Sequence, residues 1–279
     1  KAKPPMLTRE QKQAKKVLRK LKEDTAIPAI SIKIKKKKNL PLTASKFGGV
    51  PYWQPETPYP VDNQGNKMLL LAQLDCRESV SNLEAFPMTG LLQFFISSDD
   101  LAGLDCENPI SQKGHRVVYH EKIDENITKE QVLGLNIPNS TMFIEDSGLP
   151  FFECEYQLVF HLSSYSITPL DFRFEKRFRE TAKSMGIDFD TQTEIDALID
   201  DDDYDKLCQS TTGHHCGGYP YFTQDDPRQE YPQHTVLLLQ IDSEKDISWG
   251  DAGVGHFFIT LDDLKKRDFS RVLYYWDCH

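Results

Sequence analysis

The chain has 279 residues, of which 39% are hydrophobic and 27% are charged, and its formal net charge is −10. A chain of this size and composition can bury a sizeable core, and the acidic excess argues against nonspecific binding along nucleic acid, which depends on cationic side chains. No apolar run approaches the roughly 20 residues needed to cross a bilayer, and the charged start lacks the apolar core of a signal peptide, so we expect a cytoplasmic protein without membrane contact.

The N-terminal segment predicts a helix followed by a strand. Thr8 and Gln11 have the spacing of a capping box, and the apolar residues after them share one helical face, so a helix is expected over residues 8–23. Pro28 then ends the helix, and isoleucines alternate with polar residues over 30–34, as in a strand with one wet face. The lysines at 35–38 would discourage further pairing if this strand lay at a sheet edge.

Further elements follow from the hydrophobic pattern. Strands are expected over residues 68–74, 90–97, 116–120, 142–144, 236–241 and 272–276. Helices are expected over residues 79–86, 128–133, 169–185, 191–204 and 261–266, whereas 151–161 could be strand or helix. With no regular alternation of strand and helix, the pattern indicates an α+β protein with mostly antiparallel sheets.

Three phrases occur twice in the same order. Gly-Gly-Val-Pro-Tyr-Trp at 48–53 returns as Gly-Gly-Tyr-Pro-Tyr-Phe at 217–222, an aliphatic run closed by Gln and Asp ends at 75 and again at 242, and each run is followed by a glycine and paired phenylalanines. This order predicts an internal duplication. The single domain of residues 1–279 would comprise a helix and strand (1–45), a first repeat (46–110), a middle region with a helical insertion (111–212) and a second repeat (213–279).

These phrases resemble the YwqG-like family of bacterial proteins, a domain of unknown function. The resemblance covers nearly the whole chain and includes the Gly-Gly-x-Pro phrases, the Leu-Ala-Gln-Leu-Asp run at 71–75 and the Gly-Asp-Ala-Gly segment at 250–253. More distantly, the chain is similar to programmed cell death protein 2 and its relatives, which are chaperones for a ribosomal protein. That similarity implies a duplicated β-rich fold and a protein- or peptide-binding role without known catalysis, and the zinc-binding cysteine insertion of those relatives is absent here.

Metal, cofactor and disulfide signals are weak. The six cysteines form no Cys-x-x-Cys pair, as expected of reduced thiols, and His214, His215 and Cys216 are adjacent rather than spaced as ligands. We therefore predict no metal and no cofactor. The basic residues concentrated in 1–38 either form a solvated surface or bind RNA or an acidic partner, and the acidic run at 200–203 has no assigned role.

One residue pair could support catalysis. Asp251 and His256 lie five apart beside Trp249 in a glycine-rich segment, so a turn could join them as the acid/base couple of a hydrolase. No familiar nucleophile or nucleotide motif accompanies them, and Asp251 could equally bond its own turn. A binding module is therefore the main hypothesis and a hydrolase the alternative.

The expected binding site lies at the two glutamines. Gln73 and Gln240 each close an aliphatic strand, so their amides are expected near equivalent strand rims, where they could bond the extended backbone of a protein partner. The flanking Trp53 and Tyr221 would add contact area, and Trp249, Asp251 and His256 complete the candidate set. The alternative is that the amides satisfy neighbouring loops and the aromatic rings fill the core.

Overall fold

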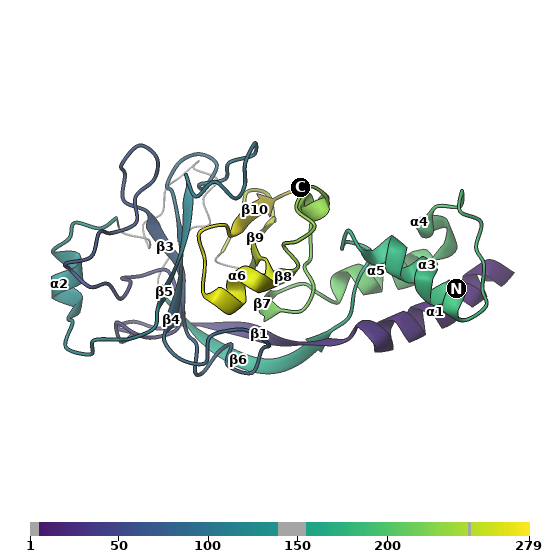
Figure 1. The fold of residues 1–279 in the computed structure, drawn as a ribbon, viewed down its shortest axis with the longest axis horizontal. Helices are drawn as coiled ribbons and strands as arrows, with labels where there is room; N and C mark the ends of the chain where they lie inside the picture. The colour runs from purple at the N-terminus through teal and green to yellow at the C-terminus, as the bar shows by residue number, and fades with distance from the viewer. Residues whose placement is uncertain (1–5, 139–154, 245–246) are drawn as a thin grey trace.

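A computed structural model describes residues 6–138, 155–244 and 247–279 (Figure 1). The strands are β1 (Ile27–Lys36), β2 (Lys46–Phe47), β3 (Leu69–Asp75), β4 (Leu91–Ile96), β5 (His115–His120), β6 (Tyr156–Tyr165), β7 (His214–Gly217), β8 (Val236–Asp242), β9 (Val254–Ile259) and β10 (Leu273–Asp277). The α-helices are α1 (Arg9–Thr25), α2 (Lys129–Leu133), α3 (Phe174–Ser184), α4 (Ile195–Leu198), α5 (Asp201–Gln209) and α6 (Leu261–Lys266), and a 3-10 turn spans Pro227–Gln229. None of the helices in these ranges is both long and apolar enough to cross a membrane.

Within the described ranges, the ten strands form one antiparallel sheet in the order β10-β9-β8-β7-β1-β6-β2-β3-β4-β5. The order is symmetric about the central pair β1 and β6, because β7 to β10 extend the sheet on one side as β2 to β5 do on the other. β3 and β8 each carry a register shift at the same point of their pairing, between Leu70 and Ala72 and between Leu237 and Leu239. The prediction of a β-rich, mostly antiparallel α+β fold is therefore confirmed.

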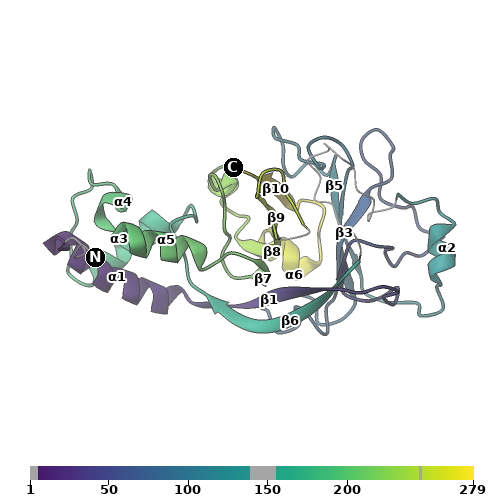
Figure 2. The ribbon, with the colours of Figure 1, turned by 180° about the vertical axis from the view of Figure 1, so that it is seen from behind.

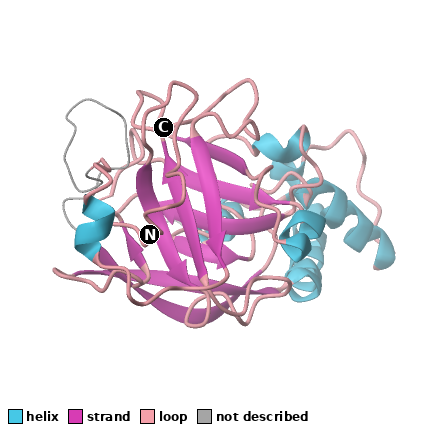
Figure 3. Cartoon of the chain, turned by 60° about the vertical axis from the view of Figure 1, so that its left-hand side comes forward, coloured by secondary structure: helices cyan, strands magenta, loops and turns pink. Residues whose placement is uncertain are grey.

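The sheet curves until its two edges approach each other (Figure 3). Phe94 of β4 lies 4.9 Å from Phe257 of β9, ring centroid to centroid, so the inner faces of the two halves share one core. At the edges, Nε2 of His115 in β5 lies 2.8 Å from the carbonyl of Val272 beside β10. The inner core is thus filled by side chains from both halves.

The helices α1, α3, α4 and α5 form a separate cluster beyond one end of the sheet, while α2 lies at the opposite end (Figure 1). Figures 1 and 2 show from opposite sides that β1 and β6 run together from the sheet toward this cluster. Its apolar core joins α1 to α3, with Val17 and Leu21 against Phe174 and Phe178. α1 begins as predicted, because the Thr8 hydroxyl accepts from Gln11 N while the Gln11 amide oxygen accepts from Thr8 N.

Several predicted elements need correction. Residues 79–86 form successive turns rather than a helix, the helix predicted from 169 starts at Phe174, and the one predicted over 191–204 is divided into α4 and α5. The division places Leu198 and Ile199 in the helical core, and the burial of these two side chains overrides the helical pattern around them. Residues 156–165 are strand, whereas 142–144 and 151–154 lie outside the described ranges. β1 lies in the centre of the sheet, so the condition under which the lysines at 35–38 would protect an edge does not arise.

The second Gly-Gly-x-Pro segment requires glycine at position 218 for steric reasons. Gly218 adopts a φ of +69°, and a Cβ built there would lie 2.6 Å from the ring of Tyr165. Because any side chain would clash there, the backbone can turn this close to β6 only at a glycine. This close approach brings the end of β6 against the second half of the sheet.

Candidate functional site

Gln73 is fully buried in β3 and holds two loops of its own half. Its Oε1 accepts from the backbone N of Tyr52 at 2.9 Å, and its Nε2 donates to the carbonyls of Leu42 at 3.0 Å and Ala44 at 2.9 Å. Gln93 of β4 donates to the same Oε1 at 2.8 Å and to the Tyr52 carbonyl at 2.7 Å. The amide thereby fixes the Gly-Gly-x-Pro loop on the strand.

Gln240 makes the same pattern in the other half. Its Oε1 accepts from Tyr221 N at 2.8 Å, and its Nε2 donates to the carbonyls of Thr211 and Gly213, both at 2.9 Å. His256 of β9 occupies the place that Gln93 has in β4, with Nε2 2.7 Å from the Tyr221 carbonyl and 3.1 Å from Gln240 Oε1. The two glutamines therefore lie at matching positions of matching strands.

The structure does not place these two amides at an accessible strand rim. Both glutamines are fully buried, and their donors and acceptors are bonded to backbone groups of this chain. In this conformation neither amide can bond the backbone of a partner. The alternative that the amides satisfy neighbouring loops describes what the hydrogen bonds do, because a buried amide without partners would be costly.

The aromatic segments that flank the two glutamines lie beside separate cores. Trp53 is 3% exposed, donates through Nε1 to the carbonyl of Thr57 at 2.9 Å and packs with Phe95 in a cluster of the first half. Tyr221 is half-buried, and its neighbour Phe222 packs with Phe258 in a cluster of the second half. The rings therefore do not meet in a shared groove between the halves. Trp249 is fully buried in the inner core against Gly255.

The Asp251 and His256 pair is not assembled. Asp251 is exposed in the turn before β9, where its carbonyl accepts from His279 N at 3.1 Å. His256 is fully buried, its Nε2 faces two oxygens, and burial lowers its pKa to about 3. A buried imidazole that faces a backbone carbonyl cannot exchange protons with an exposed carboxylate, so the structure does not bring the predicted acid/base couple together.

The adjacent histidines of β7 serve the sheet. His214 Nδ1 accepts from the backbone N of Asp242 at 2.9 Å, whereas His215 Nε2 lies 3.0 Å from the carbonyl of Tyr219. Neighbouring side chains on a strand point to opposite faces, so these two imidazoles cannot converge on one ion. The part of the chain that the structure describes holds no group of three metal-ligating side chains.

The buried histidines should make the free energy of unfolding depend on pH. Burial lowers the pKa of His115, His120 and His215 to about 4, and that of His256 to about 3, from an unfolded value near 6.5. Between these values the unfolded chain binds protons that the native chain does not, so stability falls as the pH drops below 6.5. We expect His256→Gln, which copies Gln93, to reduce this loss by about 1.4 kcal/mol per pH unit near pH 5.5.

Urea unfolding at pH 7.5, 6.5 and 5.5 measures that slope. An exposed histidine, His161, provides the control, because His161→Gln should leave the slope unchanged. An equal pH slope in the wild type and in His256→Gln would show that the buried ring is protonated in the native state.

The residues missed by the sequence analysis include a buried ion-pair network around Arg228. Its guanidinium is fully buried, and Nη2 lies 2.8 Å from Oδ2 of both Asp171 and Asp226. Arg173 also pairs with Asp171 at 2.7 Å, and the Arg228 guanidinium lies 4.3 Å from the ring centroid of Phe258. The network joins the start of α3 to the loop before β8. Its charged residues are far apart in the sequence and belong to no recognisable motif, so the sequence carries no signal for it.

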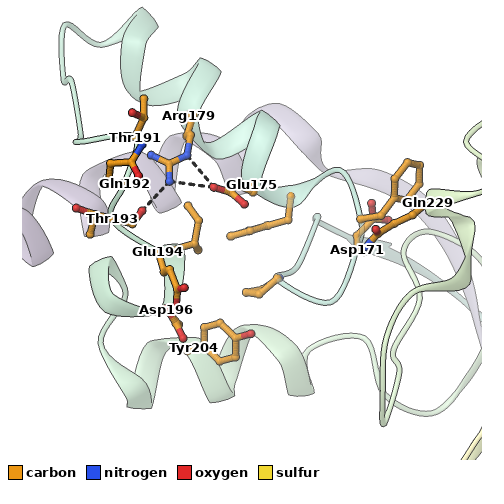
Figure 4. A pocket seen from close by; sticks show the side chains of 14 residues that line it. Asp171, Glu175, Arg179, Thr191, Gln192, Thr193, Glu194, Asp196, Tyr204 and Gln229 are labelled. Atoms are coloured by element: carbon orange, nitrogen blue, oxygen red, sulfur yellow. Dashed lines mark hydrogen bonds and ion pairs between the residues drawn. The ribbon is translucent and has the colours of Figure 1, made fainter.

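A pocket of about 480 Å³ lies in the helical cluster beside this network (Figure 4). Its one arginine, Arg179, is already engaged, with Nε 2.9 Å from Glu175 Oε1 and Nη2 2.7 Å from the carbonyl of Thr193. Much of the remaining lining is acidic or amide. The arginine thus fixes the chain around residues 190–193, and the pocket offers little apolar surface to a ligand.

A more apolar groove of about 550 Å³ lies where α1, the end of β6 and α5 meet. Its floor is aliphatic and aromatic, and it consists of Leu18, Tyr165, Ile167 and Leu207. Its rim is cationic, and it consists of Lys15, Arg19, Lys22 and Lys206, with Asp203 as the one acid among the lining residues. We call this site the α1/α5 groove. The helical spacing of Lys15, Leu18, Arg19 and Lys22 was the signal that could have identified it, because these positions share one helix face.

This architecture defines a β-rich domain of one curved antiparallel sheet with an attached helical cluster, and without an assembled acid/base couple at the predicted position. The family described as a domain of unknown function, DUF1963, matches residues 45–278, and the chain belongs to that family. The match is consistent with the YwqG-like resemblance. A comparison with curated proteins gives no match. α1 and β1 precede the matched residues, so three of the four rim cations of the α1/α5 groove lie outside them.

Proposed function

We propose that the protein is a protein- or peptide-binding module and that a segment of its partner docks in the α1/α5 groove. The observation that carries this proposal is the partly exposed apolar floor to which Leu18, Tyr165 and Leu207 contribute, within a groove of about 550 Å³. A concave apolar surface of this size, edged by a few polar groups, is typical of a binding site.

The floor of the α1/α5 groove is built from segments far apart in the sequence. Leu18 belongs to α1, Tyr165 ends β6, and Leu207 lies in α5. The wall at α1 is held in place by Ser166, whose hydroxyl donates to the carbonyl of Lys22 at 2.6 Å. A preformed site loses less conformational entropy when a ligand binds than a mobile one does.

In this proposal, the candidate residues identified from the sequence stabilise the fold and do not contact the partner. Gln73, Gln240 and His256 fix the loops of the two halves, and Trp53 and Trp249 fill cores. The proposal also includes an origin by internal duplication, which the symmetric strand order and the matching glutamine bonds support. The single-domain organisation, the chaperone-like role suggested by programmed cell death protein 2 and a cytoplasmic location remain predictions.

Replacing Leu18 by glutamine tests the groove. Phage-displayed random peptides of 12 residues selected on the wild-type protein provide probes. We expect Leu18→Gln to weaken the selected peptides about tenfold, because one leucine contact contributes on the order of 1.5 kcal/mol. Fluorescence anisotropy with the labelled peptides measures the affinity.

The matched control is Leu133→Gln, which replaces a 48% exposed leucine of α2 at the opposite end of the molecule. Circular dichroism establishes that both variants fold. Peptides that bind Leu18→Gln as well as the wild type, or no enriched peptides at all, would contradict the proposed site.

A further inference from the structure

We propose that the segment bound in the α1/α5 groove is acidic as well as apolar, and that Asp203 occupies the place of one of its carboxylates in the free protein. This inference rests on the proposed function and specifies the chemistry of the partner. It assigns a role to Asp203 of the acidic run at 200–203 and to the basic residues of α1.

The charge of the groove is opposite to that of the chain. Four cations and one acid line it, although the formal net charge of the protein is −10. The chain that leaves α1 adds no competing acid, since no aspartate or glutamate occurs from residue 25 to 55. A cationic groove on an acidic protein attracts anionic segments and disfavours basic ones.

The one acid of the groove bridges its two walls. Oδ2 of Asp203 in α5 lies 3.1 Å from Nζ of Lys15 in α1, and the two side chains are 29% and 44% exposed. An ion pair this open to solvent contributes little to stability and exchanges readily. A carboxylate from a partner can therefore take over Lys15, while the neighbouring Arg19 and Lys22 offer further cations on the same helix face.

The floor favours a peptide over a nucleic acid. Leu18, Ile167 and Leu207 are aliphatic, and Tyr165 is the single aromatic ring among the lining residues. Sequence-independent binding of single strands uses several stacked aromatic rings along a cationic track, whereas an aliphatic floor suits leucine-like side chains. An acidic peptide with aliphatic anchors is therefore the ligand that the groove fits.

Three labelled probes test the inference by fluorescence anisotropy on the full chain. The first is a 12-residue peptide in which Glu-Asp pairs alternate with leucines. The second is the same peptide with Gln in place of Glu and Asn in place of Asp, and the third is a 12-nucleotide oligouridylate. We expect the acidic peptide to bind at least about tenfold more tightly than its amide counterpart at low salt, with the difference shrinking as salt rises.

Substitutions that change the charge of the groove in opposite directions provide a second test. Arg19→Glu and Lys22→Glu should each weaken the binding of the acidic peptide by about fivefold or more, whereas Lys183→Glu, at an exposed position of α3, should leave its affinity unchanged. Asp203→Asn should strengthen it about two- to fivefold, because Lys15 is released. Asp202→Asn, which removes the exposed neighbouring carboxylate and the same formal charge, is the matched control and should change it less.

The outcomes separate this inference from the proposed function. Equal binding of the acidic and amide peptides, with loss of both in Leu18→Gln, would overturn the acidic partner and leave the peptide groove intact. No binding of the acidic peptide, tighter binding of oligouridylate, or equal affinities of Asp203→Asn and Asp202→Asn would each overturn the inference. Failure of the random-peptide selection as well would overturn the groove itself.

Discussion

Replacing Arg228 by methionine is expected to lower the free energy of unfolding by about 3–5 kcal/mol, because it leaves buried carboxylate without its cation. Asp226 is 2% exposed by side chain and pairs with Arg228 through both oxygens, whereas Asp171 retains Arg173. Burial alone would raise the pKa of Asp171, but its bonds to Arg173 and the charge of Arg228 hold it below its usual range. Chemical denaturation at neutral pH measures the loss.

The control and the rescue follow from the same physics. Lys176→Met removes an exposed helix ion pair with Glu180 and should change stability by less than about 0.5 kcal/mol. The double variant Arg228→Met/Asp226→Leu should recover part of the loss, because removing both charges leaves less unpaired charge in the interior. A loss below about 1 kcal/mol in Arg228→Met would show that the network is open to water.

Replacing Gln73 by methionine should lower the free energy of unfolding by about 3 kcal/mol. The change preserves size but leaves the buried backbone N–H of Tyr52 and two partly buried carbonyls without their partner, and each such group costs about 1–3 kcal/mol when it is fully buried. Gln240→Met should cost a similar amount, since its hydrogen bonds have the same pattern and similar lengths. Urea denaturation compares the two variants directly.

An exposed glutamine provides the reference for this comparison. Gln64→Met in the turn before β3 should change stability by less than about 0.5 kcal/mol. Wild-type stability in Gln73→Met would mean that water or a rearranged loop replaces the amide, and the glutamine would again be a candidate for ligand contact. Unequal losses in Gln73→Met and Gln240→Met would indicate that the two halves rely on their matching bonds to different degrees.

Local chemistry determined much of the fold in advance. The Thr8 capping box started α1, the aliphatic runs became β3 and β8, and the absence of strand-helix alternation indicated an antiparallel sheet. The repeated phrases placed Gln73 and Gln240 at matching positions. Each of these features depends on neighbours within a few residues or on a pattern that one strand or helix displays by itself.

The tertiary structure decided what those residues face. A glutamine that ends an aliphatic strand can point to solvent or to a loop, and only the fold of residues 42–52 and 211–221 over the strands buried both amides. Likewise, the five-residue spacing of Asp251 and His256 permitted a couple, but the sheet turned the imidazole inward. The α1/α5 groove and the Arg228 network join segments more than 50 residues apart, and chain folding alone brings such charges together.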